Sequence, residues 1–307
     1  MLKPARAALL MFEIVLVASF AIPASAQAKD RESLLSLHVV AQPILDNPTQ
    51  DNPFYLHAEV KKYKQTGQAA MYFEQPLTVL ADALSDTRNW CSVLILHLNT
   101  KACTYNANKE GEETLTIYLG RKYYQDPDDA FVMTYRFETE RQDNYFSALI
   151  TAEKGPLGTS KYRIQLEVTA IQGRTFGRFQ VSQKHSWISS RAAKLYIATV
   201  GRNKKGISII GRDSTGAPIY SEGELAIAER NLLRYYFAFT AFFHTRNDTG
   251  TDGFNERLNY WYDQTEQYRQ LYEVDRKMYI EDKVKELQNQ LALQQSQYVD
   301  RESSRNQ

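Results

Sequence analysis

The sequence predicts an α+β fold in which a curved antiparallel sheet wraps around a long C-terminal helix. The helix is indicated by residues 223–244, GELAIAERNLLRYYFAFTAFFH, whose centre is apolar or aromatic at almost every position. A helix that is apolar on all sides must be buried on all sides, and this one is shorter than the about 20 apolar residues needed to cross a bilayer. The sheet is indicated by preceding segments that alternate apolar and polar residues, as strands with one buried face do.

The order of the expected elements defines the architecture further. Strands are expected at residues 54–62, 70–73, 115–119, 131–137, 146–152, 162–168, 176–181 and 205–210. A helix is expected to begin at Pro76 and to end just before Trp90, and a second helix is expected over residues 190–199. Helix, antiparallel meander and long final helix are the order of a helix-grip fold, in which a cavity lies between the sheet and the last helix. The sheet face needs a cover, and the final helix is the segment large enough to provide it.

The first 26 residues have the pattern of an export signal. Lys3 and Arg6 give a positive start, residues 14–22 give a short apolar core, and Ala24-Ser25-Ala26 gives a small-residue cleavage site. An uncleaved membrane anchor is the alternative, and the shortness of the apolar run disfavours it. We therefore expect a protein secreted across the inner membrane into the periplasm, in which residues 27–53 form a linker.

Cys91 and Cys103 are the only two cysteines. An even number of cysteines in an oxidising compartment favours a disulfide, which should contribute about 3 kcal/mol in the chain-entropy model. Two buried free thiols are the alternative. A metal site is disfavoured, because only His97 lies between the cysteines and a fourth ligand is missing.

Composition and motifs exclude several classes of function. The 37 basic and 36 acidic residues give a net charge of +1, so there is no basic excess for binding nucleic acid. The sequence has no nucleophile elbow, phosphate-binding loop, dinucleotide fingerprint or zinc-protease motif, and its five histidines are scattered. No cofactor, metal or catalytic residue is therefore expected, and an enzyme of the cyclase type is the least favoured function.

Several short segments carry a resemblance to a known family. They are Asn89-Trp90-Cys91, 96–99 (LHLN), 101–103 (KAC), 154–159 (KGPLGT), 229–231 (ERN) and 234–236 (RYY). Together with the order of elements, they resemble START-like domains, the SRPBCC superfamily that includes Bet v 1 and polyketide-cyclase-type proteins, and in particular its exported proteobacterial members. The resemblance covers roughly residues 54–280. It implies a cavity for a hydrophobic ligand and brings no catalytic signature.

Candidate ligand-binding residues are the aromatic and basic positions expected to meet a ligand with an apolar body and a polar head. They are Trp90, His97, Arg121, Phe131, Met133, Tyr135, Phe146, Ile150, Leu157, Tyr162, Arg163, Tyr196, Arg234 and Tyr235. His97 is either a polar group at one end of the cavity or a structural histidine bonded to backbone. Leu157 lies in a turn-rich segment that is either a rigid hairpin connection or a lid over the cavity mouth.

Arg234 interrupts the apolar helix, where an unpaired charge is costly. It must therefore form an ion pair, reach water or meet an anionic ligand. Glu229, Glu167 and Glu138 are the candidate partners, and an internal ion pair is the favoured interpretation.

The domain boundaries follow from these patterns. The START-like domain is expected over residues 54–246, a helical extension over 254–295 as a single solvated helix, and a disordered tail over 296–307. The favoured function is a carrier that binds a lipid or other hydrophobic small molecule, with transient membrane contact left open. The alternative is a cell-envelope interaction module that binds a protein partner through residues 254–295.

Overall fold

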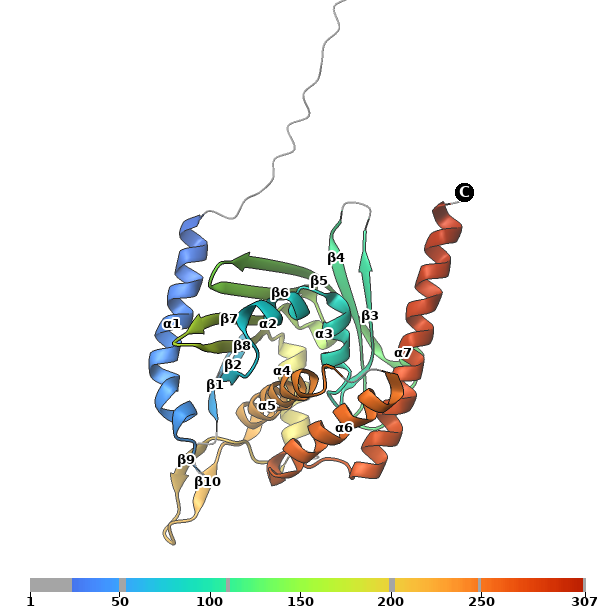
Figure 1. The fold of residues 1–307 in the computed structure, drawn as a ribbon. Coiled ribbons are helices and arrows are strands. Elements are labelled where there is room, and N and C mark those ends of the chain that lie inside the picture. The colour runs from blue at the N-terminus through green and yellow to red at the C-terminus, as the bar shows by residue number, and fades with distance from the viewer. Residues whose placement is uncertain (1–23, 50–53, 109–110, 199–201, 248–249, 306–307) are drawn as a thin grey trace, which may run out of the picture.

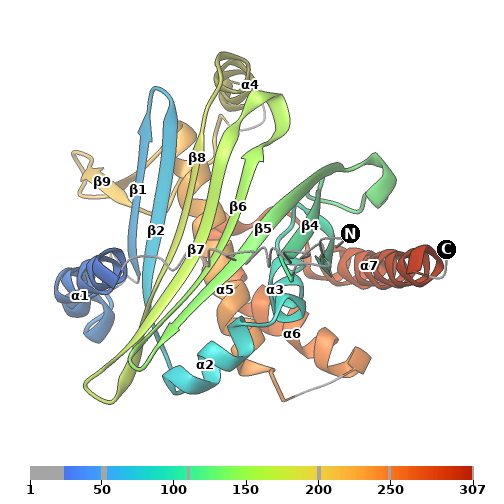
Figure 2. The same cartoon turned by 90° about the horizontal axis from the view of Figure 1, so that it is seen from above.

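In the residues that the structure describes, eight antiparallel strands form one sheet, and the long helix α5 (Gly223–His244) lies against one face of it (Figures 1 and 2). The structure is a computed structural model that describes residues 24–49, 54–108, 111–198, 202–247 and 250–305. The strands are β1 (Tyr55–Lys61), β2 (Lys64–Phe73), β3 (Thr100–Ala107), β4 (Glu113–Leu119), β5 (Phe131–Gln142), β6 (Tyr145–Lys154), β7 (Ser160–Ile171) and β8 (Arg174–Lys184). Their order is β1-β2-β8-β7-β6-β5-β4-β3, so the predicted helix-grip arrangement is confirmed.

The core lies between α5 and the sheet face that it covers. Phe239 of α5 contacts Trp90 and Phe179, with ring centroids 5.4 and 5.1 Å apart. In β5 the buried side chains include Met133 and Tyr135, which are separated by an exposed residue as the period of two predicts. The alternation of buried and exposed side chains in β5 therefore matches the period of two in its sequence, although that period alone does not show which face points inward.

The helix expected from Pro76 is interrupted. It consists of α2 (Leu77–Leu84) and α3 (Thr87–Leu94), because Asp86 starts a new helix by accepting a hydrogen bond from the backbone N–H of Arg88 at 2.9 Å. Trp90 consequently lies inside α3 rather than beyond a helix end. Its indole Nε1 donates to the carbonyl of Leu84 at 2.9 Å, which locks the two helices together.

The predicted disulfide between Cys91 and Cys103 is present. It joins α3 to β3, an edge strand that the sequence pattern did not predict. Its two ends are separated by 12 residues, and both cysteines are buried. The disulfide therefore fixes the turn over residues 95–99 between two anchored elements.

The region after the predicted cleavage site is not a linker as far as the structure describes it. Residues 1–23 of the predicted signal lie outside the described residues, and α1 spans Ala24–Asp46. This helix lies on the sheet face opposite α5 (Figure 2), where Leu34 and Leu37 form a small second core with Tyr145 and Phe176. Within the described part of the chain, no helix is long and apolar enough to span a membrane.

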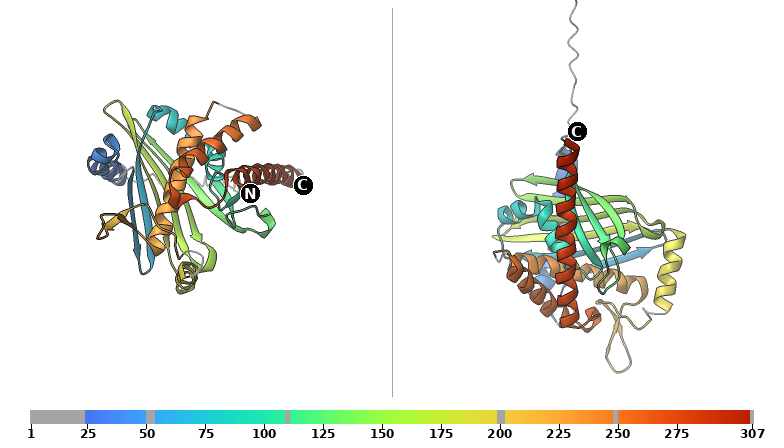
Figure 3. Two further views of the ribbon diagram at one scale, coloured as in Figure 1. Left: turned by 90° about the horizontal axis from the view of Figure 1, so that it is seen from below. Right: turned by 90° about the vertical axis from the view of Figure 1, so that its right-hand side faces the viewer.

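Two C-terminal helices follow α5 instead of one solvated helix. They are α6 (Gly250–Glu266) and α7 (Arg276–Arg305), so the predicted disordered tail is helical as far as Arg305. Helix α7 runs along the outside of β3 (Figures 1 and 3). Its Gln290 accepts a hydrogen bond from the backbone N–H of Cys103 at 2.8 Å, and Gln294 accepts one from Tyr105 at 2.9 Å. The helix thus satisfies backbone groups that an edge strand would otherwise expose.

The remaining elements are short. They are η1 (Pro127–Asp129), η2 (Pro156–Gly158), α4 (Trp187–Ala198), β9 (Ile209–Arg212), β10 (Pro218–Tyr220) and η3 (Arg269–Leu271). Strands β9 and β10 pair only with each other among the described residues, so the last predicted strand belongs to a separate hairpin and not to the main sheet.

Candidate functional site

A cavity of about 660 Å³ lies between α5 and the sheet. Its walls come from β2, β4, β5, β7 and β8, from α5 and from the turns after α3, β4 and β6. The apolar part of the lining consists of Ile117, Leu119, Phe131, Ile164, Val181 and Leu232. The strand residues share one face because they are paired across the ladders, Leu119 with Phe131 and Ile164 with Val181.

His97 is the most buried polar group at the cavity wall, with 3% of its surface exposed. Its Nδ1 accepts a hydrogen bond from the backbone N–H of Asn99 at 3.2 Å, which places the proton of the neutral ring on Nε2. That Nε2 is buried and has no hydrogen-bond partner among the described residues. Burial, followed by the positive charges of Arg234, Lys283 and Lys101, holds the pKa of His97 well below 6.5. The imidazole is therefore a neutral donor whose Nε2–H has no well-aligned acceptor in the described part of the chain, with the Asn231 side chain as its nearest polar neighbour.

Tyr235 of α5 fixes the orientation of this ring. The two rings stack with centroids 4.6 Å apart and planes 16° apart. Burial raises the pKa of the Tyr235 hydroxyl to about 12, so it remains a neutral phenol. Asn231, one helical turn earlier, also lines the cavity, and its side chain, as a hydrogen-bond acceptor toward the ring, partly opposes the fall in the pKa of His97. Its side-chain oxygen accepts a hydrogen bond from Arg234 at 3.3 Å.

Two further tyrosines line the cavity, and both are neutral. Tyr135 and Tyr162 contact each other edge to face, with centroids 6.4 Å apart. The hydroxyl of Tyr135 donates to the sulfur of Met133 at 3.4 Å, and that of Tyr162 shares a 2.6 Å hydrogen bond with Thr159. Burial raises the pKa of both tyrosines. They present ring faces and edges to the cavity and no charge.

The polar rim of the cavity is built on the turn after β4. Gln125 accepts a hydrogen bond from the backbone N–H of Arg121 at 3.0 Å and donates to the carbonyl of Asp129 at 2.6 Å. A side chain at Gly120 would lie 2.7 Å from Gln125, so the glycine permits this packing. The Arg121 guanidinium is exposed and donates to the Tyr123 hydroxyl at 3.4 Å. The rim therefore carries a positive charge in contact with solvent.

The structure brings some of the sequence-predicted ligand residues together and separates others. The cavity is lined by His97, Arg121, Phe131, Tyr135, Tyr162 and Tyr235. The core, away from the cavity lining, holds Trp90, Met133, Phe146 and Ile150. Arg163 lies on the opposite strand face and donates to Gln165 at 2.9 Å. Leu157 is 57% exposed beside Pro156, which does line the cavity, and the side chain of Tyr196 in α4 lies outside the described residues.

Arg234 does form an internal ion pair, but its partner is none of the three carboxylates named above. It pairs with Glu273 at 3.2 Å and donates to the carbonyl of Leu271 at 3.1 Å. Burial by itself would raise the pKa of Glu273, but Lys122, Lys204 and Arg234 together lower it to about 2. Arg234 therefore anchors the segment between α6 and α7 instead of facing the cavity.

The three expected partners of Arg234 are engaged elsewhere. Glu229 accepts hydrogen bonds from the backbone N–H groups of Ile207 and Ser208, Glu167 pairs with Arg178, and Glu138 pairs with Arg136 on the surface. A partner 39 residues further along the chain could not be identified from local spacing.

Asn231 and Asn99, the polar neighbours of His97, are not among the ligand-binding residues that the sequence predicts. Asn231 could have been found, because it lies four residues before Tyr235 and so on the same helix face. Asn99 acts through its backbone N–H, and its side chain donates to the carbonyl of Gly120 at 2.7 Å. Nothing in the residue type signals such a backbone role.

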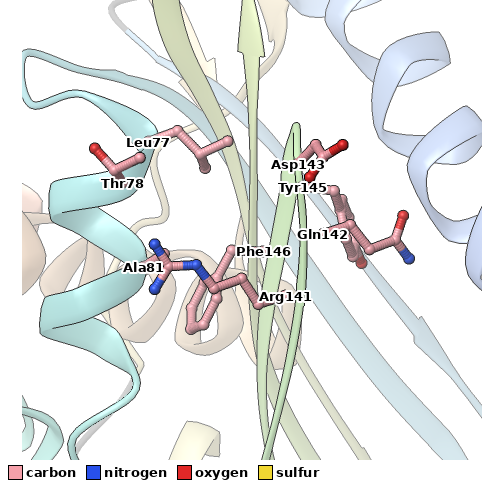
Figure 4. A pocket seen from close by; sticks show the side chains of 8 residues that line it. All are labelled: Leu77, Thr78, Ala81, Arg141, Gln142, Asp143, Tyr145 and Phe146. Atoms are coloured by element: carbon pink, nitrogen blue, oxygen red, sulfur yellow. The ribbon is translucent and has the colours of Figure 1, made fainter.

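A smaller depression of about 340 Å³ lies between α2 and the β5–β6 hairpin (Figure 4). Arg141 reaches across it and pairs with Asp82 at 2.6 Å, and both side chains are at least half exposed. Its polar groups thus have partners or solvent, in contrast to the buried Nε2 of His97. The described residues also contain no group of three or more His, Cys, Asp or Glu side chains that could hold a metal ion.

No family model and no curated protein sequence matches the chain. Solved structures share part of its fold. The Zhui aromatase/cyclase from Streptomyces sp. R1128 is 11% identical over 46% of this chain and 86% of its own, with a TM-score of 0.32. Ginseng major latex-like protein 151 from Panax ginseng is 6% identical over 44% and 93%, with a TM-score of 0.27. Protein Ms6760 from Mycobacterium smegmatis is 14% identical over 48% and 88%, with a TM-score of 0.29. At this level of similarity the likeness concerns the chain path alone.

Proposed function

We propose that this protein binds a lipid or another hydrophobic small molecule in the cavity beneath α5 and acts as an exported carrier. The observation that carries the proposal is the cavity of about 660 Å³ with an unsatisfied buried donor in its wall. Sites for small molecules are typically concave and mostly apolar, with a few polar groups that fix the orientation of the ligand. The strand residues and Leu232 supply the apolar wall, and the Nε2–H of His97 supplies the polar group.

The chemistry of His97 limits the kinds of polar group that the ligand can carry. A buried N–H without an acceptor is costly, so a ligand oxygen that accepts a hydrogen bond is favoured at this position. The charges around the ring are cations, which keep it neutral. We therefore infer a ligand with an apolar body and a carbonyl, ether or hydroxyl oxygen that reaches His97.

Export is supported by two features of the chain. Residues 1–26 carry the pattern of an export signal, and the Cys91–Cys103 disulfide suits an oxidising compartment. Acid–base catalysis has less support, because Nδ1 of His97 is occupied by a backbone N–H and no carboxylate among the described residues contacts the ring. The interaction role of residues 254–295 also has less support, because α7 uses its buried face to cover β3.

The first test is native mass spectrometry of the protein purified from its own compartment, repeated after organic extraction. The proposal expects a stoichiometric species that is released by the solvent and that contains a long apolar portion. A protein that is empty in both measurements, and that also fails to bind fluorescent fatty-acid and sterol probes, would refute the proposal.

The second test replaces the donor. His97→Phe keeps a ring that stacks on Tyr235 but removes the Nε2–H, so we expect the affinity for the extracted ligand to fall about tenfold. His57→Phe is the matched control, because His57 is exposed on β1 and remote from the cavity lining. If the two variants bind the ligand with equal affinity, His97 does not contribute to ligand binding.

A further inference from the structure

A second pocket, of about 670 Å³, lies behind α5 as seen from the cavity. Leu232 and Tyr235 line the cavity, whereas Arg230 lines the second pocket. At 3.6 residues per turn, Arg230 projects about 160° around the helix from Leu232. The other walls come from residues 203–205 and Ile207, ahead of β9, from Tyr220 of β10, and from residues 267–270 and Tyr272, around η3. The two hollows are therefore separate sites on opposite faces of one helix.

Arg230 is buried, and none of the described residues pairs with its side chain. It is 3% exposed, its Nε has no hydrogen-bond partner, and its guanidinium forms no ion pair with the described residues. The adjacent Glu229 does not serve it, because that carboxylate accepts hydrogen bonds from Ile207, Ser208 and the hydroxyl of Ser221. A buried charge in a protein is normally paired, so the free guanidinium indicates an anion that completes the site.

The charges around the pocket have the same sign. Lys204, Lys205 and Arg269 also line it, and its lining contains no aspartate or glutamate. Lys204 pairs with Glu273, and Lys205 pairs with a glutamate outside the lining. Arg269 is exposed and forms no ion pair within the part of the chain that the structure describes. The two arginines therefore leave an excess of two positive charges at one pocket.

Tyrosines complete the lining. Tyr220, Tyr268 and Tyr272 all contribute to it, and Tyr268 is held in place by stacking on Phe237 with centroids 5.8 Å apart. Phenol hydroxyls donate hydrogen bonds to oxyanions, and the rings offer apolar area to an attached organic group. Tyr272 is 58% exposed, so the pocket opens to solvent on that side.

We propose that this pocket binds an oxyanion of the phosphate type, with Arg230 as its principal ligand and Arg269 at its entrance. The planar guanidinium matches the oxygens of a phosphate group and forms paired hydrogen bonds with them. A dianion also balances the two unpaired arginines, which a single carboxylate does not. The phosphate is either free or the monoester headgroup of a lipid such as phosphatidic acid. This site does not depend on the occupancy of the cavity. Failure of phosphate binding would therefore not affect the proposal of a hydrophobic ligand in the cavity, and the reverse also holds.

Calorimetry with inorganic phosphate, at constant ionic strength set by sodium chloride, tests the site. Arg230→Met removes the guanidinium and keeps an apolar side chain in the buried position. We expect it to weaken phosphate binding about tenfold or more, since charge-assisted hydrogen bonds are lost. Arg269→Gln changes an exposed residue, so we expect the variant to fold as the wild type does. Its affinity for phosphate should fall about threefold, because one positive charge is lost. Arg136→Gln, on the exposed face of β5, is the control and should bind as the wild type does.

Vesicle flotation distinguishes the two sources of the phosphate. The vesicles contain phosphatidylcholine with phosphatidic acid, whose headgroup is a phosphate monoester. A headgroup is indicated if they bind the wild type, release it on addition of inorganic phosphate and fail to bind Arg230→Met. Phosphate binding without vesicle binding indicates a free phosphate, and both results support the site. Absence of phosphate binding by the wild type, or equal binding by the Arg230→Met, Arg269→Gln and Arg136→Gln variants, would overturn the proposal.

Discussion

The ammonium of Lys283 donates a hydrogen bond to the backbone carbonyl of His97 at 2.7 Å, so the last helix holds the turn that carries the cavity imidazole. The same ammonium donates to the carbonyl of Thr100 at 2.8 Å and pairs with Glu286 at 2.7 Å. Burial, opposed by Glu286, lowers the pKa of Lys283 to about 8. Helix α7 therefore supports the turn that carries His97 and is not an appendage of the domain.

Lys283→Met is expected to destabilise the protein and to loosen the His97 turn. It removes the donor to two buried carbonyls and one of the two lysines that pair with Glu286, a loss of about 3 kcal/mol by analogy with broken buried pairs. Denaturant unfolding at pH 7 measures the change, and ligand affinity should fall with it. Lys277→Met, at an exposed position of the same helix, is expected to change neither quantity. Equal unfolding midpoints for the two variants would contradict the role of Lys283.

The parts of the fold that were predicted are those in which an apolar face is buried against another apolar face. Helix α5 and strands β4 to β8 are of this kind, and their periods of 3.6 and 2 appear in the sequence. Strand β3 was missed, because residues 100–104 are buried on both faces and show no alternation. The sequence pattern predicts a solvated α7, because its buried face carries the polar residues Lys283, Glu286 and Gln290. In the structure Lys283 and Gln290 bind main-chain groups of the His97 turn and of β3, and Glu286 pairs with Lys101.

The sequence predicts the strand residues of the cavity lining but not the face of α5 that borders the cavity. The strand positions of the lining, such as Phe131 and Tyr135, followed from the alternation of the strands. On α5, by contrast, Arg234 and Tyr235 are neighbours in sequence, yet about 100° of rotation separates them. Tyr235 faces the cavity, and Arg234 faces Glu273. The pattern of an almost uniformly apolar helix does not indicate which of its faces borders the cavity.

Gly67→Val is expected to close part of the cavity without destabilising the fold. A Cβ at Gly67 would lie 3.6 Å from a methyl group of Leu232, an ordinary contact, and Gly67 itself lines the cavity. Valine is favoured over glycine in a strand interior by about 0.5–1 kcal/mol, so the melting temperature should be unchanged or higher. The additional methyl groups should reduce binding of the hydrophobic ligand.

Gly67→Ala is the matched control, because its single methyl group makes the same contact with Leu232 and extends less into the cavity. Titration with a fluorescent hydrophobic probe should give clearly weaker binding for valine than for alanine at this position. If both variants are folded and bind the probe with the same affinity, the ligand does not bind in this cavity.

Acid should destabilise the protein through Glu273, which holds Lys122, Lys204 and Arg234 together. Its pKa is about 2 in the folded protein against an ordinary value of 4.5. A carboxyl group with a lowered folded pKa contributes stability that is fully present above the unfolded value and is lost as the pH falls through the folded value. A difference of this size corresponds to about 3 kcal/mol, lost between about pH 4.5 and 2.

Glu273→Gln removes this titration and leaves three cations without their shared carboxylate. We expect the variant to be less stable than the wild type by about 3 kcal/mol at pH 7 and to lose less stability in acid, so that the two curves converge near pH 2. Urea unfolding at a series of pH values from 7 to 2 measures both curves. Glu138→Gln, at an exposed pair with Arg136, should follow the wild type throughout. Parallel curves for the wild type and Glu273→Gln would show that the acid sensitivity originates at other carboxylates.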